Sequence, residues 1–110
     1  MRRSNEPLFW ALFSGGGMLA AIVAPALILV SALLVPAERV GFDRLEAIFT
    51  HPVARVALLG FAFLVFFHWA HRFRHVLTDL GLRSLDRPIA VACYGLAVVG
   101  TMWAGMVVSM

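Results

Sequence analysis

The stretch LFWALFSGGGMLAAIVAPALILVSALLV, residues 8–35, contains no charged side chain and decides the fold class. A helix crosses the hydrocarbon core of a membrane, about 30 Å thick, with roughly 20 apolar residues. At a rise of about 1.5 Å per residue, this stretch forms a helix of about 42 Å, which is longer than one crossing needs. We therefore predict a transmembrane helix that is tilted, kinked at Pro25 or partly interfacial.

Two more helical stretches follow, over residues 53–79 and 88–109; the first of them is apolar as far as Trp69 and polar beyond it. Between the first and second stretches, residues 38–51 alternate apolar and charged positions in the pattern of a short amphipathic helix at a membrane surface. The sequence thus predicts an all-α integral membrane protein with three transmembrane helices and one short amphipathic interfacial helix. Residues 1–110 are expected to form a single membrane-anchor domain.

The composition excludes a separate soluble domain, because 62% of the residues are hydrophobic and only 14% are charged. The formal net charge of +3 comes from arginines in short segments beside the apolar stretches, which indicates membrane topology and not nucleic-acid binding. Cys93 is the only cysteine, so an intramolecular disulfide and an iron–sulfur cluster bound by this chain alone are excluded. We expect Cys93 to behave as a small buried apolar residue.

The N-terminal part of the chain has some features of a cleavable signal peptide. Arg2-Arg3 and Val35-Pro36-Ala37 resemble parts of a cleavable signal, but the apolar core of a signal peptide has only about 7–15 residues, so we expect no cleavage.

The arginines also predict the orientation, because cytoplasmic segments carry an excess of arginine. The N-terminal segment and the segment from the end of the second helix onward carry Arg2, Arg3, Arg72, Arg74, Arg83 and Arg87. The segment that leads into the second helix and its first turn carry only Arg39, Arg44 and Arg55. We expect a cytoplasmic N-terminus and an outward-facing C-terminus.

The chemistry-bearing residues lie at the end of the second stretch. His68, His71, Arg72 and His75 fall on one helical face, and such groups normally point into a bundle or a cavity. The predicted topology brings Trp10 to the same side of the membrane. An imidazole, a guanidinium and an indole N–H together suit a quinone head group, whose oxygens gain negative charge and exchange protons.

Other interpretations stay open at this point. The arginines could simply lie at the interface and follow the topology rule, and the tryptophans could form an interfacial belt. His68 or His71 could supply one haem ligand if a partner supplied the other.

The motifs together resemble a known family. Ser4-Asn5-Glu6-Pro7-Leu8-Phe9-Trp10, with His71-Arg72, His75 and Asp79-Leu80 farther along, is similar to the membrane-anchor D subunit of bacterial quinol–fumarate reductase. The resemblance implies a non-catalytic hydrophobic anchor in the cytoplasmic membrane. With a second three-helix anchor subunit, it would tether a flavoprotein subunit carrying FAD and an iron–sulfur subunit carrying the clusters.

The resemblance also implies a menaquinone/menaquinol site shared between these subunits, with Trp10, His71 and Arg72 as its quinone-binding residues here. Arg74 and Thr78 stand where the family is richer in histidine, so no histidine relay beyond His71 is carried over and His75 is given no role. The alternatives are a succinate dehydrogenase anchor with haem b and a small membrane transporter or assembly protein. Transport is disfavoured because the apolar runs at residues 8–35, 53–69 and 88–110 contain no acidic residue.

Overall fold

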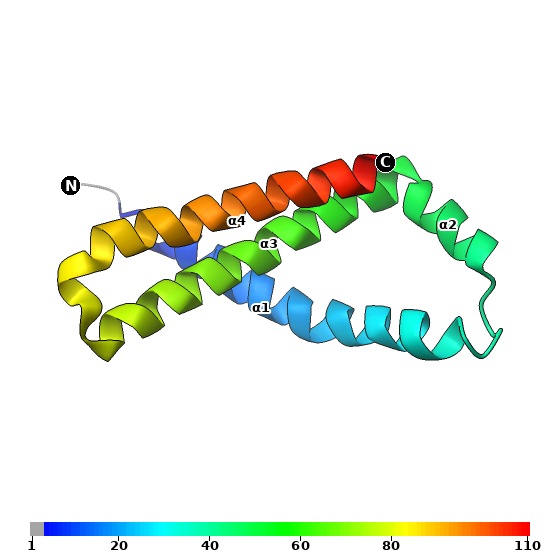
Figure 1. Ribbon diagram of the computed structural model, residues 1–110, viewed down its shortest axis with the longest axis horizontal. Helices are drawn as coiled ribbons and strands as arrows, with labels where there is room; N and C mark the ends of the chain where they lie inside the picture. Colours follow the sequence, from blue (N-terminus) through cyan, green and yellow to red (C-terminus); the bar gives the residue numbers. More distant parts are fainter. Residues whose placement is uncertain (1–3) are drawn as a thin grey trace.

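The computed structural model describes residues 4–110, whose regular structure is entirely helical (Figure 1). The α-helices are α1 (Glu6–Leu29), α2 (Phe42–Thr50), α3 (Pro52–Leu77) and α4 (Asp86–Ser109). A π-helical turn, η1 (Val30–Leu34), continues α1, and two short segments, η2 (Thr78–Leu82) and η3 (Arg83–Leu85), join α3 to α4. The predicted all-α class is confirmed for these residues. Arg2 and Arg3 lie outside them.

Helix α3 is the centre of the arrangement. Helix α4 runs back alongside it, whereas α1 crosses α3 and then turns away, and α2 returns the chain to the start of α3 (Figure 1). The few fully buried residues lie mainly between α3 and α4, where Ala70, Cys93 and Ala97 pack together. The interpretation of Cys93 as a small buried residue is therefore confirmed.

The crossing of α1 and α3 depends on two glycines. A Cβ atom on Gly16 would collide with the backbone carbonyl of Leu64 and approach the Cβ of His68 to 2.9 Å, and one on Gly17 would lie 2.7 Å from the His68 ring. Gly15, by contrast, has nothing within 4 Å of such an atom. Two of the three consecutive glycines thus allow close helix contact, as expected for small residues in membrane helices.

The ends of the helices follow from local chemistry. Helix α1 begins at Glu6, whose N–H donates to the Ser4 hydroxyl at 3.2 Å, while Asn5 makes no capping bond with its side chain. Pro25 lies inside α1, which continues through it to Leu29. Gly81 has a φ of 109°, a conformation that glycine adopts readily, and it terminates the helical path of α3.

The outer surface is strongly apolar. Two helical stretches, Glu6–Leu34 and Pro52–Ser109, are long and apolar enough to cross a membrane. The second is folded back at Gly81, so that it contains both α3 and α4. Large apolar side chains such as Ile22, Val91 and Met102 are about two-thirds exposed or more, as expected for a surface that faces lipid or other subunits.

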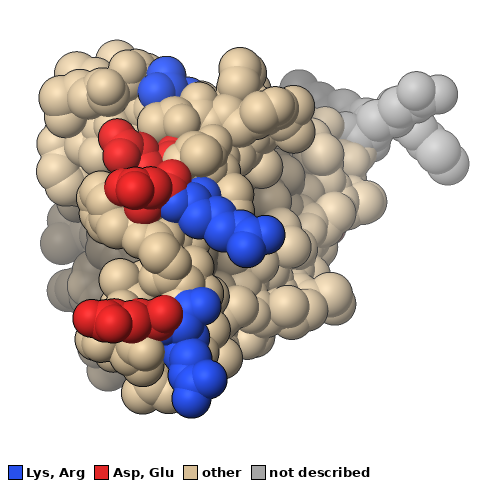
Figure 2. Space-filling view, turned by 90° about the vertical axis from the view of Figure 1, so that its right-hand side faces the viewer, with Lys and Arg blue, Asp and Glu red and all other residues tan. Residues whose placement is uncertain are grey.

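The end of the molecule that carries α2 has charges of both signs. Figure 2 shows acidic and basic side chains side by side on this face. The charged residues in and just before α2 are Glu38, Arg39, Asp43, Arg44 and Glu46. The predicted short helix is present at Phe42–Thr50, and charge of neither sign dominates around it.

Candidate functional site

The polar residues singled out from the sequence gather at the opposite end of the molecule, where α1 begins and α3 ends. His71 projects from α3, with its ring centroid 6.2 Å from that of Trp10 in an edge-on arrangement. His75 lies one turn farther along α3, and its ring centroid is 4.6 Å from that of His71. Two residues about sixty positions apart in the sequence, Trp10 and His71, are therefore neighbours in the fold.

A pocket of about 310 Å³ lies at this position. Ligand pockets of proteins usually start at about this size, so it suits a small aromatic head group better than a large ligand. All three residues proposed to bind a quinone, Trp10, His71 and Arg72, belong to its lining. The full lining consists of Trp10, Phe13, His71, Arg72, His75 and Asp79.

A second pocket of about 370 Å³ adjoins the first. Trp10, His71 and His75 line both pockets, so the His71 imidazole forms part of the wall between them. The lining of the second pocket consists of Glu6, Phe9, Trp10, His71, Arg74, His75 and Tyr94.

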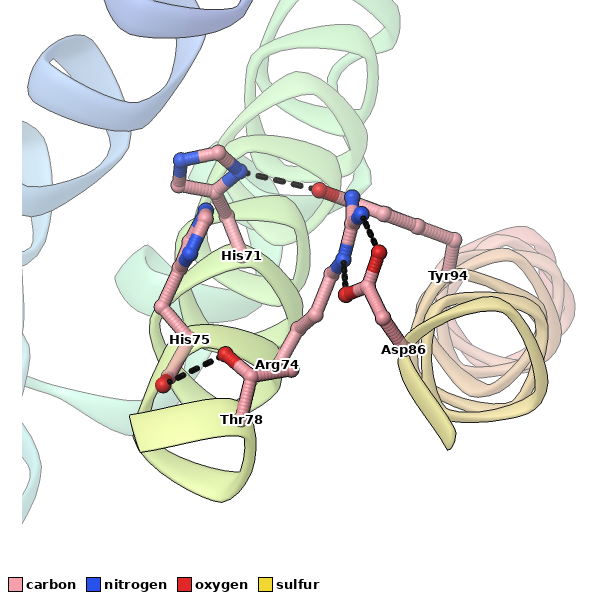
Figure 3. Close-up of polar contacts among 6 residues, drawn as sticks. All are labelled: His71, Arg74, His75, Thr78, Asp86 and Tyr94. Carbon is pink, nitrogen blue, oxygen red and sulfur yellow. Dashed lines mark hydrogen bonds and ion pairs between the residues drawn. The ribbon is translucent and has the colours of Figure 1, made fainter. Parts of the chain in front are cut away.

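His71 has a polar partner that sequence reasoning missed. Its Nδ1 atom lies 2.9 Å from the hydroxyl oxygen of Tyr94, which comes from α4 (Figure 3). The available signal was weak, because Tyr94 is the only tyrosine of the chain and lies within an apolar stretch. Which apolar position of α4 faces His71 depends on how the two helices pack.

Arg74 likewise has a partner from α4. Its Nε and Nη2 atoms donate to the two carboxylate oxygens of Asp86 at 3.0 and 2.8 Å, and its guanidinium carbon is 5.8 Å from the centre of the Tyr94 ring (Figure 3). These hydrogen bonds hold the pKa of the Asp86 carboxyl below its ordinary value, and the positive charges of Arg74 and His75 act in the same direction. Arg74 is thus more than an interfacial arginine that follows the topology rule.

His68 faces a different direction from the other histidines. Its Nδ1–H donates to the backbone carbonyl of Phe13 in α1 at 2.7 Å, and its ring stacks on the Phe13 ring with centroids 4.3 Å apart. It lines neither of the two pockets. His68 therefore links α3 to α1 through a hydrogen bond and a ring stack, both with Phe13.

Within residues 4–110, no cluster of three or more histidine, cysteine, aspartate or glutamate side chains is arranged to hold a metal ion. The donors around the first pocket are instead an indole N–H, an imidazole and a guanidinium. This set can donate hydrogen bonds to an oxygen atom, stabilise negative charge on it and accept a proton from it.

The chain is similar to a family of named bacterial proteins. Residues 1–109 match the family described as the D subunit of fumarate reductase. A protein from Mycobacterium tuberculosis (strain ATCC 25618 / H37Rv), named as the fumarate reductase D subunit, is 44% identical over 108 residues, which cover 94% of this chain and 86% of the relative.

Relatives of lower identity carry the same name. The one from Vibrio cholerae serotype O1 (strain M66-2) is 31% identical over 103 residues, covering 89% of this chain and 78% of the relative. The one from Shewanella sp. (strain W3-18-1) is 32% identical over 111 residues, covering 93% and 91%.

Proposed function

Because the chain belongs to the family of fumarate reductase D subunits, we propose that this membrane anchor of fumarate reductase completes a menaquinol-oxidising site with Trp10, His71 and Arg72. The anchor is not catalytic by itself. The family assignment also favours fumarate reductase over the succinate dehydrogenase anchor with haem b.

The observation that carries the proposed site is the common pocket. Trp10, His71 and Arg72 line one pocket of about 310 Å³ at the end of α3, together with apolar and aromatic surface. A quinone head group needs donors to its oxygens and a nearby group that takes up protons. Trp10 donates its indole N–H, His71 accepts a proton, and Arg72 stabilises negative charge on the head group.

The substrate's electrons leave the membrane anchor. Oxidation of menaquinol to menaquinone releases two electrons and two protons. We propose no electron carrier within this chain. The electrons pass to the clusters of the iron–sulfur subunit and then to FAD in the flavoprotein, where fumarate is reduced to succinate. The iron–sulfur subunit and a second three-helix anchor would form the remaining walls of the pocket.

The proposed membrane topology follows from helix length and charge. Three helices, over about residues 8–35, 53–79 and 88–109 of a single membrane-anchor domain, cross the cytoplasmic (inner) membrane, and α2 lies at its outer surface. The end of α3, its connection to α4 and the first turn of α4 carry Arg72, Arg74, Arg83 and Arg87, whereas the α2 end has mixed charge. This difference supports a cytoplasmic N-terminus and quinol site, with the C-terminus outside.

The site is tested by replacing Arg72 with leucine in the complete complex. Arg72→Leu should lower menaquinol-linked fumarate reduction at least tenfold, because loss of one fixed donor to developing negative charge typically costs on the order of 100-fold. Fumarate reduction with a soluble dye as electron donor should be unchanged, since it bypasses the anchor.

Arg87→Leu is the matched control, because Arg87 is an exposed arginine at the same end of the molecule and lines neither pocket. Its menaquinol-linked activity should match that of the wild type. An equal loss of menaquinol-linked and dye-linked activity in Arg72→Leu would indicate a role in assembly and would contradict the pocket assignment.

A further inference from the structure

We propose that Tyr94 is a positioning residue for His71, and that the Arg74–Asp86 ion pair holds Tyr94 in place. This inference rests on the proposed menaquinol site and adds to it three residues, two of them from α4. None of the three was assigned a role in quinone binding from the sequence.

The first observation is the hydrogen bond between His71 and Tyr94. The Tyr94 hydroxyl lies 2.9 Å from Nδ1 of His71, and both groups are partly buried. Because Nδ1 and Nε2 lie on different edges of an imidazole ring, this bond leaves Nε2 directed away from Tyr94 (Figure 3). His71 also lines the pocket that contains Trp10 and Arg72, so Nε2 is the ring nitrogen left for a substrate there.

The second observation is the restraint on Tyr94 itself. The Arg74 guanidinium lies against the Tyr94 ring, 5.8 Å from its centre, and is held by two hydrogen bonds to Asp86. A two-point contact between arginine and a carboxylate fixes the plane of the guanidinium. The Tyr94 ring therefore lies against the fixed guanidinium of Arg74, while its hydroxyl forms the hydrogen bond with His71.

His71 is held on its other sides by aromatic neighbours. The His75 ring packs edge-on at 4.6 Å between centroids, and the Phe67 ring lies nearly parallel to His71 at 6.2 Å. These contacts limit the position of the ring, but they do not determine which nitrogen carries the proton. Only the hydroxyl of Tyr94 makes a hydrogen bond to the imidazole within the described chain.

The chemical consequence concerns proton transfer from menaquinol. When Nδ1–H donates to the Tyr94 oxygen, Nε2 has a free lone pair that accepts the proton of a menaquinol hydroxyl. The O–H bond breaks, the N–H bond forms at Nε2, and the bonding pair stays on the substrate oxygen. The substrate's electrons then pass to the clusters of the iron–sulfur subunit. The bond to Tyr94 stabilises the resulting imidazolium.

The test is Tyr94→Phe in the complete membrane-bound complex, assayed with a water-soluble menaquinol analogue. The variant keeps the aromatic ring and removes the hydroxyl alone. We expect kcat for quinol-linked fumarate reduction to fall on the order of tenfold, because a general base contributes about 100-fold or more and depends on its protonation state. The KM for the quinol should stay within about twofold, since Trp10 and Arg72 still bind it.

Two further variants control for structural effects. Thr101→Val removes a hydroxyl from the same helix, one that donates only to the backbone carbonyl of Ala97, and it should leave kcat and KM unchanged. Asp86→Asn weakens the ion pair that holds the Arg74 guanidinium against the Tyr94 ring. It should therefore also lower kcat without raising KM. Dye-linked fumarate reduction should be unchanged in all three variants.

His71→Gln distinguishes failure of this inference from failure of the proposed function. If His71→Gln loses quinol-linked activity while Tyr94→Phe and Asp86→Asn keep the wild-type kcat, the positioning role is wrong and the quinol site stands. If His71→Gln keeps quinol-linked activity, both are wrong. A parallel loss of dye-linked activity and subunit recovery in Tyr94→Phe would show a purely structural role and would also overturn the inference.

Discussion

At the scale of single residues, His68 and His71 show that two histidines less than one helix turn apart can contact different helices. Both have the same side chain and lie near the same end of α3, yet His68 donates to the Phe13 carbonyl of α1 and His71 pairs with the Tyr94 hydroxyl of α4. The difference arises because α3 is packed between two helices. Each histidine contacts the helix that its face of α3 meets.

Asp86 gives a residue-scale prediction for pH. Hydrogen bonds from Arg74 lower the pKa of its carboxyl from the ordinary value of 3.8. A carboxyl whose pKa is lower in the folded state stabilises the fold above its unfolded pKa, and this contribution is lost as the pH falls through the folded value. The Tm of wild-type complex should thus exceed that of Asp86→Asn by a constant amount from pH 7 to about pH 5.

Below pH 3.8 this difference in Tm should shrink as the wild-type carboxyl takes up its proton. Asp43→Asn is the matched control, since Asp43 lies on α2 at the other end of the molecule and has no ion pair within 4.0 Å among the described residues. A difference between wild type and Asp86→Asn that stayed the same down to pH 3 would contradict the role of the charged pair.

At the scale of helices, the glycines of α1 determine where it crosses α3. Gly16→Ala places a methyl group against the Leu64 carbonyl and the His68 side chain, so the two helices must move apart. We expect this substitution to destabilise the anchor by about 1–3 kcal/mol, the usual cost of overpacking a close contact. The measurement is the Tm of the purified complex.

Gly15→Ala makes the same chemical change one residue earlier in the same helix. Because an added Cβ at Gly15 has nothing within 4 Å, Tm should be unchanged or slightly higher, as alanine favours a helix more than glycine does. Equal destabilisation by both substitutions would mean that α1 and α3 do not cross at Gly16.

At the scale of the whole molecule, the number of membrane crossings determines which side each terminus occupies. Three crossings put the two ends on opposite sides, whereas two crossings put them on the same side. With Cys93 replaced by alanine, we expect a membrane-impermeant maleimide to label Ser109→Cys in intact cells and Ser4→Cys only in inverted membrane vesicles. Labelling of both Ser4→Cys and Ser109→Cys in inverted vesicles, with neither labelled in intact cells, would put both termini on one side and rule out the three-crossing topology.

Much of the fold and part of the site could be predicted from the sequence. Helices over the three apolar stretches and the short amphipathic helix between the first two follow from composition and from the spacing of apolar residues, and the structure contains each of them. The meeting of Trp10 with His71 and Arg72 was also predicted, because topology and family resemblance both bring the start of the first helix to the end of the second. These features depend on short-range signals or on the number of helices.

Tertiary packing alone decided which side chains meet across the helices. The Tyr94–His71 hydrogen bond, the Arg74–Asp86 pair and the turning of His68 toward Phe13 depend on the rotation of α1 and α4 about their own axes. An apolar stretch with a weak helical pattern does not specify that rotation, because lipid accepts any apolar face. Here it is set by the close approach at Gly16 and Gly17 and by the tight connection at Gly81, which bring distant residues into contact.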